Sequence, residues 1–259
     1  MMFARLSRLS RLSRLPGGPA RNAFQASALV AVLALAACAS PSSRFYTLGG
    51  ASVGASGSTS AGASSVRTAA APAWLIEVAP IDVPPQVAKT QLVVQTGPTQ
   101  VKVLEEERWA SLPGDELRRA LSTSLTQQLN TIDVYGTAYS DTTPVYRVSV
   151  NVQRFESWPG SHALIDAVWS VRAVRSTAVM TCRSVVSEQV GSGYDSLVDG
   201  HRRALQRVSE QVAGALRVMA AASSASAGAA AGASSSQAKG ATRVNVPACP
   251  SDGAAVAAG

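Results

Sequence analysis

Two segments made almost entirely of small residues limit where this chain can bury a hydrophobic core. Residues 49–72 and 221–241 consist mainly of Ala, Ser, Gly and Thr, and the chain up to residue 259 is little different. Such segments bury too little apolar surface to offset the entropy lost on ordering. We therefore predict a flexible insert at 49–72 and a disordered tail at 221–259. Between them, residues 73–220 are enough for one domain with one core.

Within residues 73–220 the hydrophobic pattern changes its period several times. The apolar runs at 74–82 and 91–96 are each followed by proline-containing breaks, so we predict two strands there and a short third strand at 101–104. From residue 113 to 129 leucines recur every four positions, and Pro113, Asp115 and Glu116 suit the first turn of a helix.

The second half of this region shows the clearest alternation of apolar and polar residues. Residues 145–155 alternate cleanly, which indicates a strand with one buried face. A turn at 157–160, further strands around 165–173 and 179–190, and an amphipathic helix at 196–220 should follow. We predict a single α+β domain in which a mixed, largely antiparallel β-sheet packs against two helices.

The N-terminus has the organisation of a secretory signal. Its first 25 residues contain arginines and no acidic residue, and an apolar run at 26–37 is interrupted only by Ser27. This run is shorter than the roughly 20 residues that a membrane-spanning helix needs. Leu35-Ala36-Ala37-Cys38 resembles the lipobox of bacterial lipoproteins. We predict a signal peptide at 1–37, with a diacylglyceryl group on the Cys38 thiol and a fatty acyl chain such as palmitate on its amino group. An ordinary secretory signal with a chance cysteine is the alternative.

Residues around the predicted cleavage site also bear on localisation and charge. Ala39 follows Cys38 in place of the Asp that often retains lipoproteins in the inner membrane, so we expect the protein to be in the outer membrane and to face the periplasm.

The whole chain carries a net charge of +7, which could suggest nucleic acid as a partner. Five arginines leave with the signal, so 18 basic residues remain against 16 acidic ones. We therefore exclude nucleic acid.

The remaining two cysteines are Cys182 and Cys249. The periplasm permits disulfides, and the two cysteines could form a bridge or both stay free. Spacing alone does not decide between these alternatives.

Residues that could carry chemistry form no catalytic, cofactor-binding or metal-binding pattern. His162 and His201 have no cysteine or carboxylate at metal-ligand spacing, and we expect His201 to be a satisfied, half-buried residue. Residues 105–107 are three consecutive glutamates, which we interpret as a solvated approach to the first helix. We predict no enzymatic activity and no cofactor beyond the covalent lipid. Trp109 should close one end of the core, and Trp158 should lie at a hairpin tip, where it either forms an interface or folds back over the sheet edge.

Five short motifs follow the lipobox in a fixed order. They are Arg44-Phe45-Tyr46-Thr47-Leu48; Val83-Pro84 with Gln91-Leu92-Val93-Val94; Arg108-Trp109-Ala110; Tyr146-Arg147-Val148-Ser149-Val150 with Phe155; and Ala167-Val168-Trp169-Ser170-Val171. From Cys38 to about Met219 the chain resembles the ABC-type transport auxiliary lipoproteins, the PqiC-like family of the paraquat-inducible operon.

The resemblance implies a role in the cell envelope. Such proteins are docking or accessory subunits of MCE-type systems, which transport phospholipid between membranes and support envelope integrity. The implied partners are an MCE-domain (PqiB-like) protein, an inner-membrane permease reached through it, and further copies of the chain in a ring-shaped homo-oligomer. The alternative is a stand-alone periplasmic lipid-binding carrier. The resemblance also implies that residues 38–48 form a lipidated N-terminus whose first strand joins the sheet of the domain at 73–220.

Overall fold

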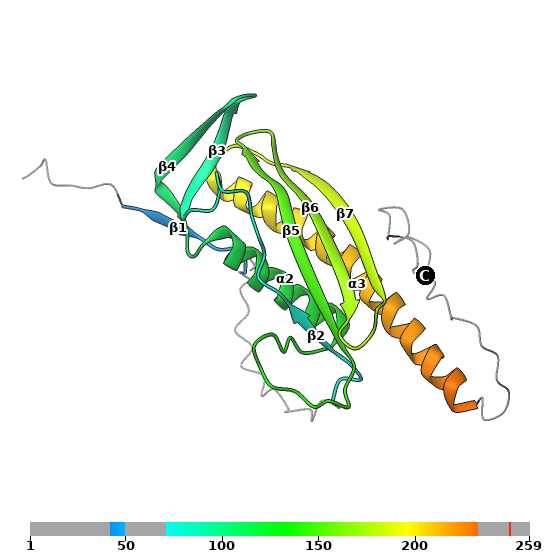
Figure 1. Ribbon diagram of the computed structural model, residues 1–259. Coiled ribbons are helices and arrows are strands. Elements are labelled where there is room, and N and C mark those ends of the chain that lie inside the picture. Colours follow the sequence, from blue (N-terminus) through cyan, green and yellow to red (C-terminus); the bar gives the residue numbers. More distant parts are fainter. Residues whose placement is uncertain (1–41, 50–70, 233–248, 250–259) are drawn as a thin grey trace, which may run out of the picture. The chain divides into compact units, whose positions relative to one another are not determined.

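The computed structural model describes residues 42–49, 71–232 and Cys249, and from Ser43 onward the chain forms one unit. Within these residues, the strands form two sheets (Figure 1). The three-stranded sheet contains, in spatial order, β1 (Arg44–Tyr46), β4 (Gln100–Trp109) and β3 (Gln91–Gly97). The four-stranded sheet contains β2 (Leu75–Val78), β5 (Val145–Trp158), β6 (His162–Ala173) and β7 (Val179–Gln189). The helices are α2 (Pro113–Leu129) and α3 (Tyr194–Gly232).

Strand directions in both sheets are mixed. β1 runs parallel to β4 and β2 runs parallel to β5, whereas the pairs β3–β4, β5–β6 and β6–β7 are antiparallel. The predicted α+β fold, with a mixed, largely antiparallel arrangement and two helices, is confirmed. The difference is that the strands divide into two sheets instead of one.

Alternation along β5, β6 and β7 places one face of the four-stranded sheet against the helices. Val150, Trp169 and Cys182 are neighbours across these three strands, and all three are buried. α3 contacts β6 and β7, and α2 contacts α3 and β2. Figure 1 shows α3 running along one face of this sheet. The amphipathic pattern of each helix is therefore satisfied by helix-on-sheet and helix-on-helix packing.

Several boundaries differ from the sequence predictions, and three of the differences change the interpretation. β4 continues to Trp109, so the glutamates at 105–107 lie within a strand and do not form a solvated approach to α2. Ser157 and Trp158 end β5, and the turn follows them, with Gly160 at φ +70°, a conformation that favours glycine. α3 continues to Gly232 and includes the start of the segment predicted to be a disordered tail. Alanine is the best helix former, so an Ala-rich extension of an existing helix remains helical.

Candidate functional site: a clamp on the N-terminal segment

The N-terminal segment that follows the predicted lipid site is built into the domain by backbone pairing. Arg44, Phe45 and Tyr46 lie opposite Glu107, Arg108 and Trp109 of β4. The Ala110 amide donates a hydrogen bond of 2.7 Å to the Tyr46 carbonyl, which extends this pairing beyond the strand. Residues 44–46 therefore belong to the sheet, as the resemblance implied.

Glu107 holds the first half of this segment. Its buried carboxylate accepts a hydrogen bond of 3.0 Å from Arg44 Nε and one of 2.6 Å from the Tyr46 hydroxyl. Both partners are on β1, and Glu107 is on β4, so one side chain ties the two strands together. Burial, and then the hydrogen bond to Glu107, raise the pKa of the Tyr46 hydroxyl, which stays protonated as a donor.

Glu116 holds the second half of the segment from the first turn of α2. Its buried carboxylate accepts hydrogen bonds from the Thr47 hydroxyl (2.7 Å) and the Leu48 amide (2.9 Å) at one oxygen. The other oxygen accepts from the Ser111 hydroxyl (2.6 Å) and lies 3.3 Å from Arg119 Nη2. A carboxylate is also favoured here by the positive end of the helix dipole.

The protonation state of Glu116 follows from these contacts. Burial by itself would raise the pKa of this carboxyl group. The hydrogen bonds from Ser111, Thr47 and the Leu48 amide, together with the charge of Arg119, outweigh burial and lower the pKa below its ordinary value. Glu116 is therefore a carboxylate that accepts only, as its four donors require.

A third contact comes from α3. Arg202 donates a hydrogen bond of 2.6 Å from Nη2 to the Thr47 carbonyl and pairs through Nη1 with Asp199, also at 2.6 Å. We call Glu107, Glu116 and Arg202 the N-terminal clamp. They come from β4, α2 and α3, so the segment 44–48 is fixed by three elements that are far apart in the sequence.

A groove lies beside the clamp, between α2 and α3. It has a volume of about 370 Å³ and is open to solvent on one side. Its lining residues are Leu48, Gly49, Ala120, Thr123, Ser124, Gln127, Arg202, Arg203, Leu205 and Gln206. The groove is lined from both helices and from the end of the clamped segment.

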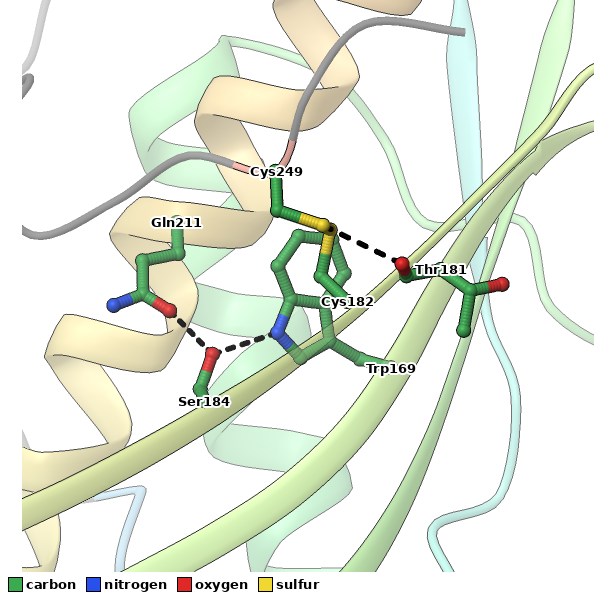
Figure 2. Close-up of a disulfide and its surroundings, with 6 residues drawn as sticks. All are labelled: Trp169, Thr181, Cys182, Ser184, Gln211 and Cys249. Atoms are coloured by element: carbon green, nitrogen blue, oxygen red, sulfur yellow. Dashed lines mark hydrogen bonds between the residues drawn. A yellow bond between two sulfur atoms is a disulfide. The ribbon is translucent and has the colours of Figure 1, made fainter.

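The two remaining cysteines are joined in the structure. Cys182 and Cys249 form a disulfide with a Cα–Cα distance of 5.8 Å, which fits the usual geometry of such bridges. Figure 2 shows the bridge beside Trp169 and close to the Thr181 carbonyl on β7. Trp169 Nε1 donates a hydrogen bond of 2.7 Å to the Ser184 hydroxyl, which in turn contacts Gln211 on α3. The bridge thus joins the chain beyond α3 to the buried face of β7.

The aromatic and histidine residues singled out from the sequence make contacts of their own. Trp158 is half-buried at the end of β5, where its ring stacks on His162 at 5.7 Å and its Nε1 donates to Glu156 at 3.0 Å. Trp109 is buried. His201 is fully buried instead of half-buried, and it is not fully satisfied, because its Nδ1 has no hydrogen-bond partner among the described residues. His201 stacks on Phe155 at 4.0 Å and its Nε2 lies 2.8 Å from the Ser157 hydroxyl. Burial lowers the pKa of His201 to about 3.

Other predicted features lie outside the described residues. These are Cys38, the signal peptide at 1–37, most of the insert, and the tail beyond Gly232 apart from Cys249. In the part of the chain that the structure describes, no helix is both long enough and apolar enough to cross a membrane.

Sequence reasoning did not identify Glu107 and Glu116 as binding residues. Glu116 was assigned to a helix start, and nothing in the sequence shows that its oxygens meet residues about 70 positions earlier in the chain. Glu107 had a usable signal, because it is two residues before Trp109 and shares its face if the strand continues. Treating the three glutamates as one charged run concealed that alternation.

The fold and the clamp together define a class of protein. It is a small α+β domain in which the segment directly after a predicted membrane anchor forms a strand of the domain's three-stranded sheet. The sequence model of the ABC-type transport auxiliary lipoprotein component family matches residues 58–213. The chain belongs to this family. The match begins after β1, so the clamped strand itself lies upstream of the matched residues.

Two solved structures are similar to this chain, and the first of them supports the fold. A crystal structure of an uncharacterized protein is similar with a TM-score of 0.52 and 18% sequence identity, covering 68% of this chain and 99% of that one. A Xanthomonas campestris protein of family DUF330 matches with a TM-score of 0.44 and 18% identity, covering 58% and 88% of the two chains. No curated protein sequence matches this chain significantly.

Proposed function

We propose that this protein is an outer-membrane lipoprotein, anchored through Cys38 and facing the periplasm. In this role it is a docking or accessory subunit of an MCE-type intermembrane phospholipid transport system. Its partners are an MCE-domain (PqiB-like) protein, an inner-membrane permease reached through that protein, and further copies of itself in a ring. Membership in the auxiliary lipoprotein family supports association with an ABC-type transport system.

The N-terminal clamp is the observation that carries the docking role. Only residues 39–43 separate Cys38 from β1. At about 3.3–3.6 Å per residue, a lipid on Cys38 would hold the domain within roughly 20–25 Å of the membrane. A subunit that receives a periplasm-spanning partner at the outer membrane has to be held near that membrane, and the clamp provides this.

The proposal includes the absence of enzymatic activity. Ser157 and His201 form a serine–histidine hydrogen bond, but both residues are buried in the core. A nucleophile in this position has no access to a substrate. The depressed pKa of His201 also makes it a weak base at neutral pH.

The anchor is tested by labelling and fractionation. Cells fed a clickable palmitate analogue should incorporate it into the wild-type chain, which should fractionate with the outer membrane. The Cys38→Ser variant should lose the label. Recovery of the wild-type protein from the soluble periplasm without the palmitate label would contradict the anchor.

The partner is tested by mild cross-linking in cells, followed by affinity purification in detergent. We expect an MCE-domain protein to be recovered with the wild-type chain. The control is an unrelated outer-membrane lipoprotein carrying the same tag, which should not recover it. Equal recovery with both proteins, or with neither, would count against the docking role.

Mass photometry of the purified protein tests the proposed ring. A ring of several copies predicts a discrete species larger than a monomer.

The carrier alternative makes a different prediction for the same molecule. A carrier lacking residues 1–38 would co-purify with lipid or take up labelled phospholipid. The groove between α2 and α3 is open, whereas carriers and ligand sites bury most of their ligand's surface. We therefore expect no stoichiometric lipid, and its presence would favour the carrier.

A further inference from the structure

Phe45 is the most exposed of the large hydrophobic side chains that the structure describes. Its side chain is on β1, and the residue is 66% exposed. Its neighbours Arg44 and Tyr46 both turn toward Glu107. Because side chains alternate along a strand, Phe45 points to the opposite face. The aromatic ring is therefore directed away from the core.

The clamp makes this exposure a fixed feature of the molecule. Backbone pairing with β4 fixes the strand, and Glu107 holds the residue on each side of Phe45. A phenylalanine on a flexible segment can fold back against the protein, but a clamped strand keeps it in solvent. A large apolar ring that cannot fold back onto the protein is available to a partner outside the domain.

The neighbour of Phe45 on the adjacent strand β4 suits a membrane surface. Arg108 lies opposite Phe45 in the parallel register. The Arg108 side chain is 35% exposed. Long arginine side chains can lie along apolar surface while their guanidinium groups reach lipid phosphates.

The position of Phe45 in the chain indicates which partner the exposed ring contacts. Phe45 follows Cys38 by seven residues, which limits its distance from the lipid-bearing backbone to about 25 Å. The described residues begin at Ser42, three positions before Phe45, and the segment that carries Cys38 ends there. We propose that Phe45 inserts into the headgroup region of the phospholipid membrane that holds the acyl chains of Cys38. This inference rests on the proposed anchor and adds to it a defined orientation of the domain.

Charge around the ring indicates the kind of lipid dependence to expect. Glu105 lies 3.7 Å from Arg108, and Glu106 accepts a hydrogen bond of 3.2 Å from the Ser43 hydroxyl. The charge of Arg108 is therefore balanced by nearby carboxylates. Insertion should depend on the apolar ring and only weakly on the anionic lipid content or on salt.

The test places a fluorescent reporter at Phe45 in the full acylated chain. The Phe45→Cys variant, labelled with an environment-sensitive dye, is reconstituted into vesicles of phosphatidylethanolamine and phosphatidylglycerol, with or without spin-labelled lipid. The matched control is Val185→Cys on β7, an exposed apolar position on the other sheet. We expect a blue shift at position 45 and spin-label quenching at least threefold stronger than at position 185.

The outcomes separate this inference from the proposed anchor. If the protein does not float with vesicles, the anchor fails and the inference fails with it. If it floats but the two positions are quenched equally, the anchor stands and the insertion of Phe45 is wrong. A blue shift at position 45 in the non-acylated Cys38→Ser background, without vesicles, would show that a second copy of the chain covers the ring, and would also overturn the inference.

Discussion

Glu116 shows how much of the N-terminal clamp depends on one carboxylate. Four donors face its two oxygens. In the Glu116→Gln variant an NH₂ group replaces one of these oxygens, and because NH₂ is itself a donor, two of the four donors lose their acceptor. Leaving buried donors without an acceptor costs about 1–3 kcal/mol. We expect the free energy of unfolding, measured by urea denaturation, to fall by about that amount.

The control for this prediction is Glu105→Gln. Glu105 is 67% exposed at its side chain, and among the described residues its carboxylate pairs with Arg108, three positions later on the same strand. Surface ion pairs of this kind contribute little, so we expect a change within about 0.5 kcal/mol. Equal effects of the two variants would show that Glu116 does not hold the segment.

His201 predicts a specific pH dependence of stability. Its pKa is about 3 in the folded protein, because burial disfavours the charged ring, against 6.5 ordinarily. The unfolded chain therefore binds the proton first as the pH falls. The contribution of His201 to the free energy of unfolding is constant above pH 6.5 and declines from there toward pH 3. At pH 5 the loss is about 2 kcal/mol.

The measurement for His201 is urea denaturation at pH 7.0, 6.0 and 5.0. The His201→Gln variant has no group titrating in this range at that position, so its stability should change less between pH 7 and pH 5, whatever its absolute value. Parallel curves for wild type and His201→Gln would refute the prediction.

At the scale of elements, the disulfide determines how the chain beyond α3 is attached to β7. The bridge joins Cys182 to Cys249, which are 67 positions apart in the sequence. A crosslink of this span stabilises a fold by about 2–4 kcal/mol through restriction of the unfolded chain. We expect Cys249→Ser to lower the free energy of unfolding by this amount, and the denatured wild-type protein without reductant to show no free thiol at either position.

Reduction provides the control for the disulfide. Cys249 is exposed, so replacing it removes the bridge without disturbing the core around Trp169 and Cys182. The reduced wild type and Cys249→Ser should therefore unfold at the same urea concentration. A thiol titration that finds both cysteines free in the oxidised protein would contradict the bridge.

The elements also show which parts of the fold were accessible from sequence. α2 was predicted with its observed bounds, because a leucine every four residues and a proline at the start leave one interpretation. β5 to β7 followed from alternation. The division into two sheets was not predictable, since the parallel pairing of β1 with β4 joins residues about 60 positions apart and leaves no local pattern. The Glu116 site is of the same kind: local sequence places it in a helix turn, and only the fold supplies its donors.

At the scale of the whole molecule, the clamp changes what the insert at 49–72 does. A lipid anchor followed by a long flexible segment would leave the domain free to move far from the membrane. Here the chain is fixed at residues 44–48, before the insert begins, so the insert is a connection within the domain and not a tether. With the proposed lipid on Cys38, the distance between domain and membrane would be set by residues 39–43 alone.

Cleavage of the insert distinguishes these two arrangements. A protease site placed between residues 55 and 65 of the acylated protein separates β1 from the rest of the domain in the covalent chain. Because Glu107, Glu116 and Arg202 still hold the segment 44–48, we expect the cleaved domain to stay with the membranes after washing in ordinary buffer and to leave them in urea. Adding Glu107→Ala and Glu116→Ala should release the cleaved domain without urea, while the uncleaved double variant stays bound through its continuous chain. Release of the cleaved wild-type domain by buffer alone would mean that the insert is the tether, and that the clamp is too weak to hold the domain at the membrane.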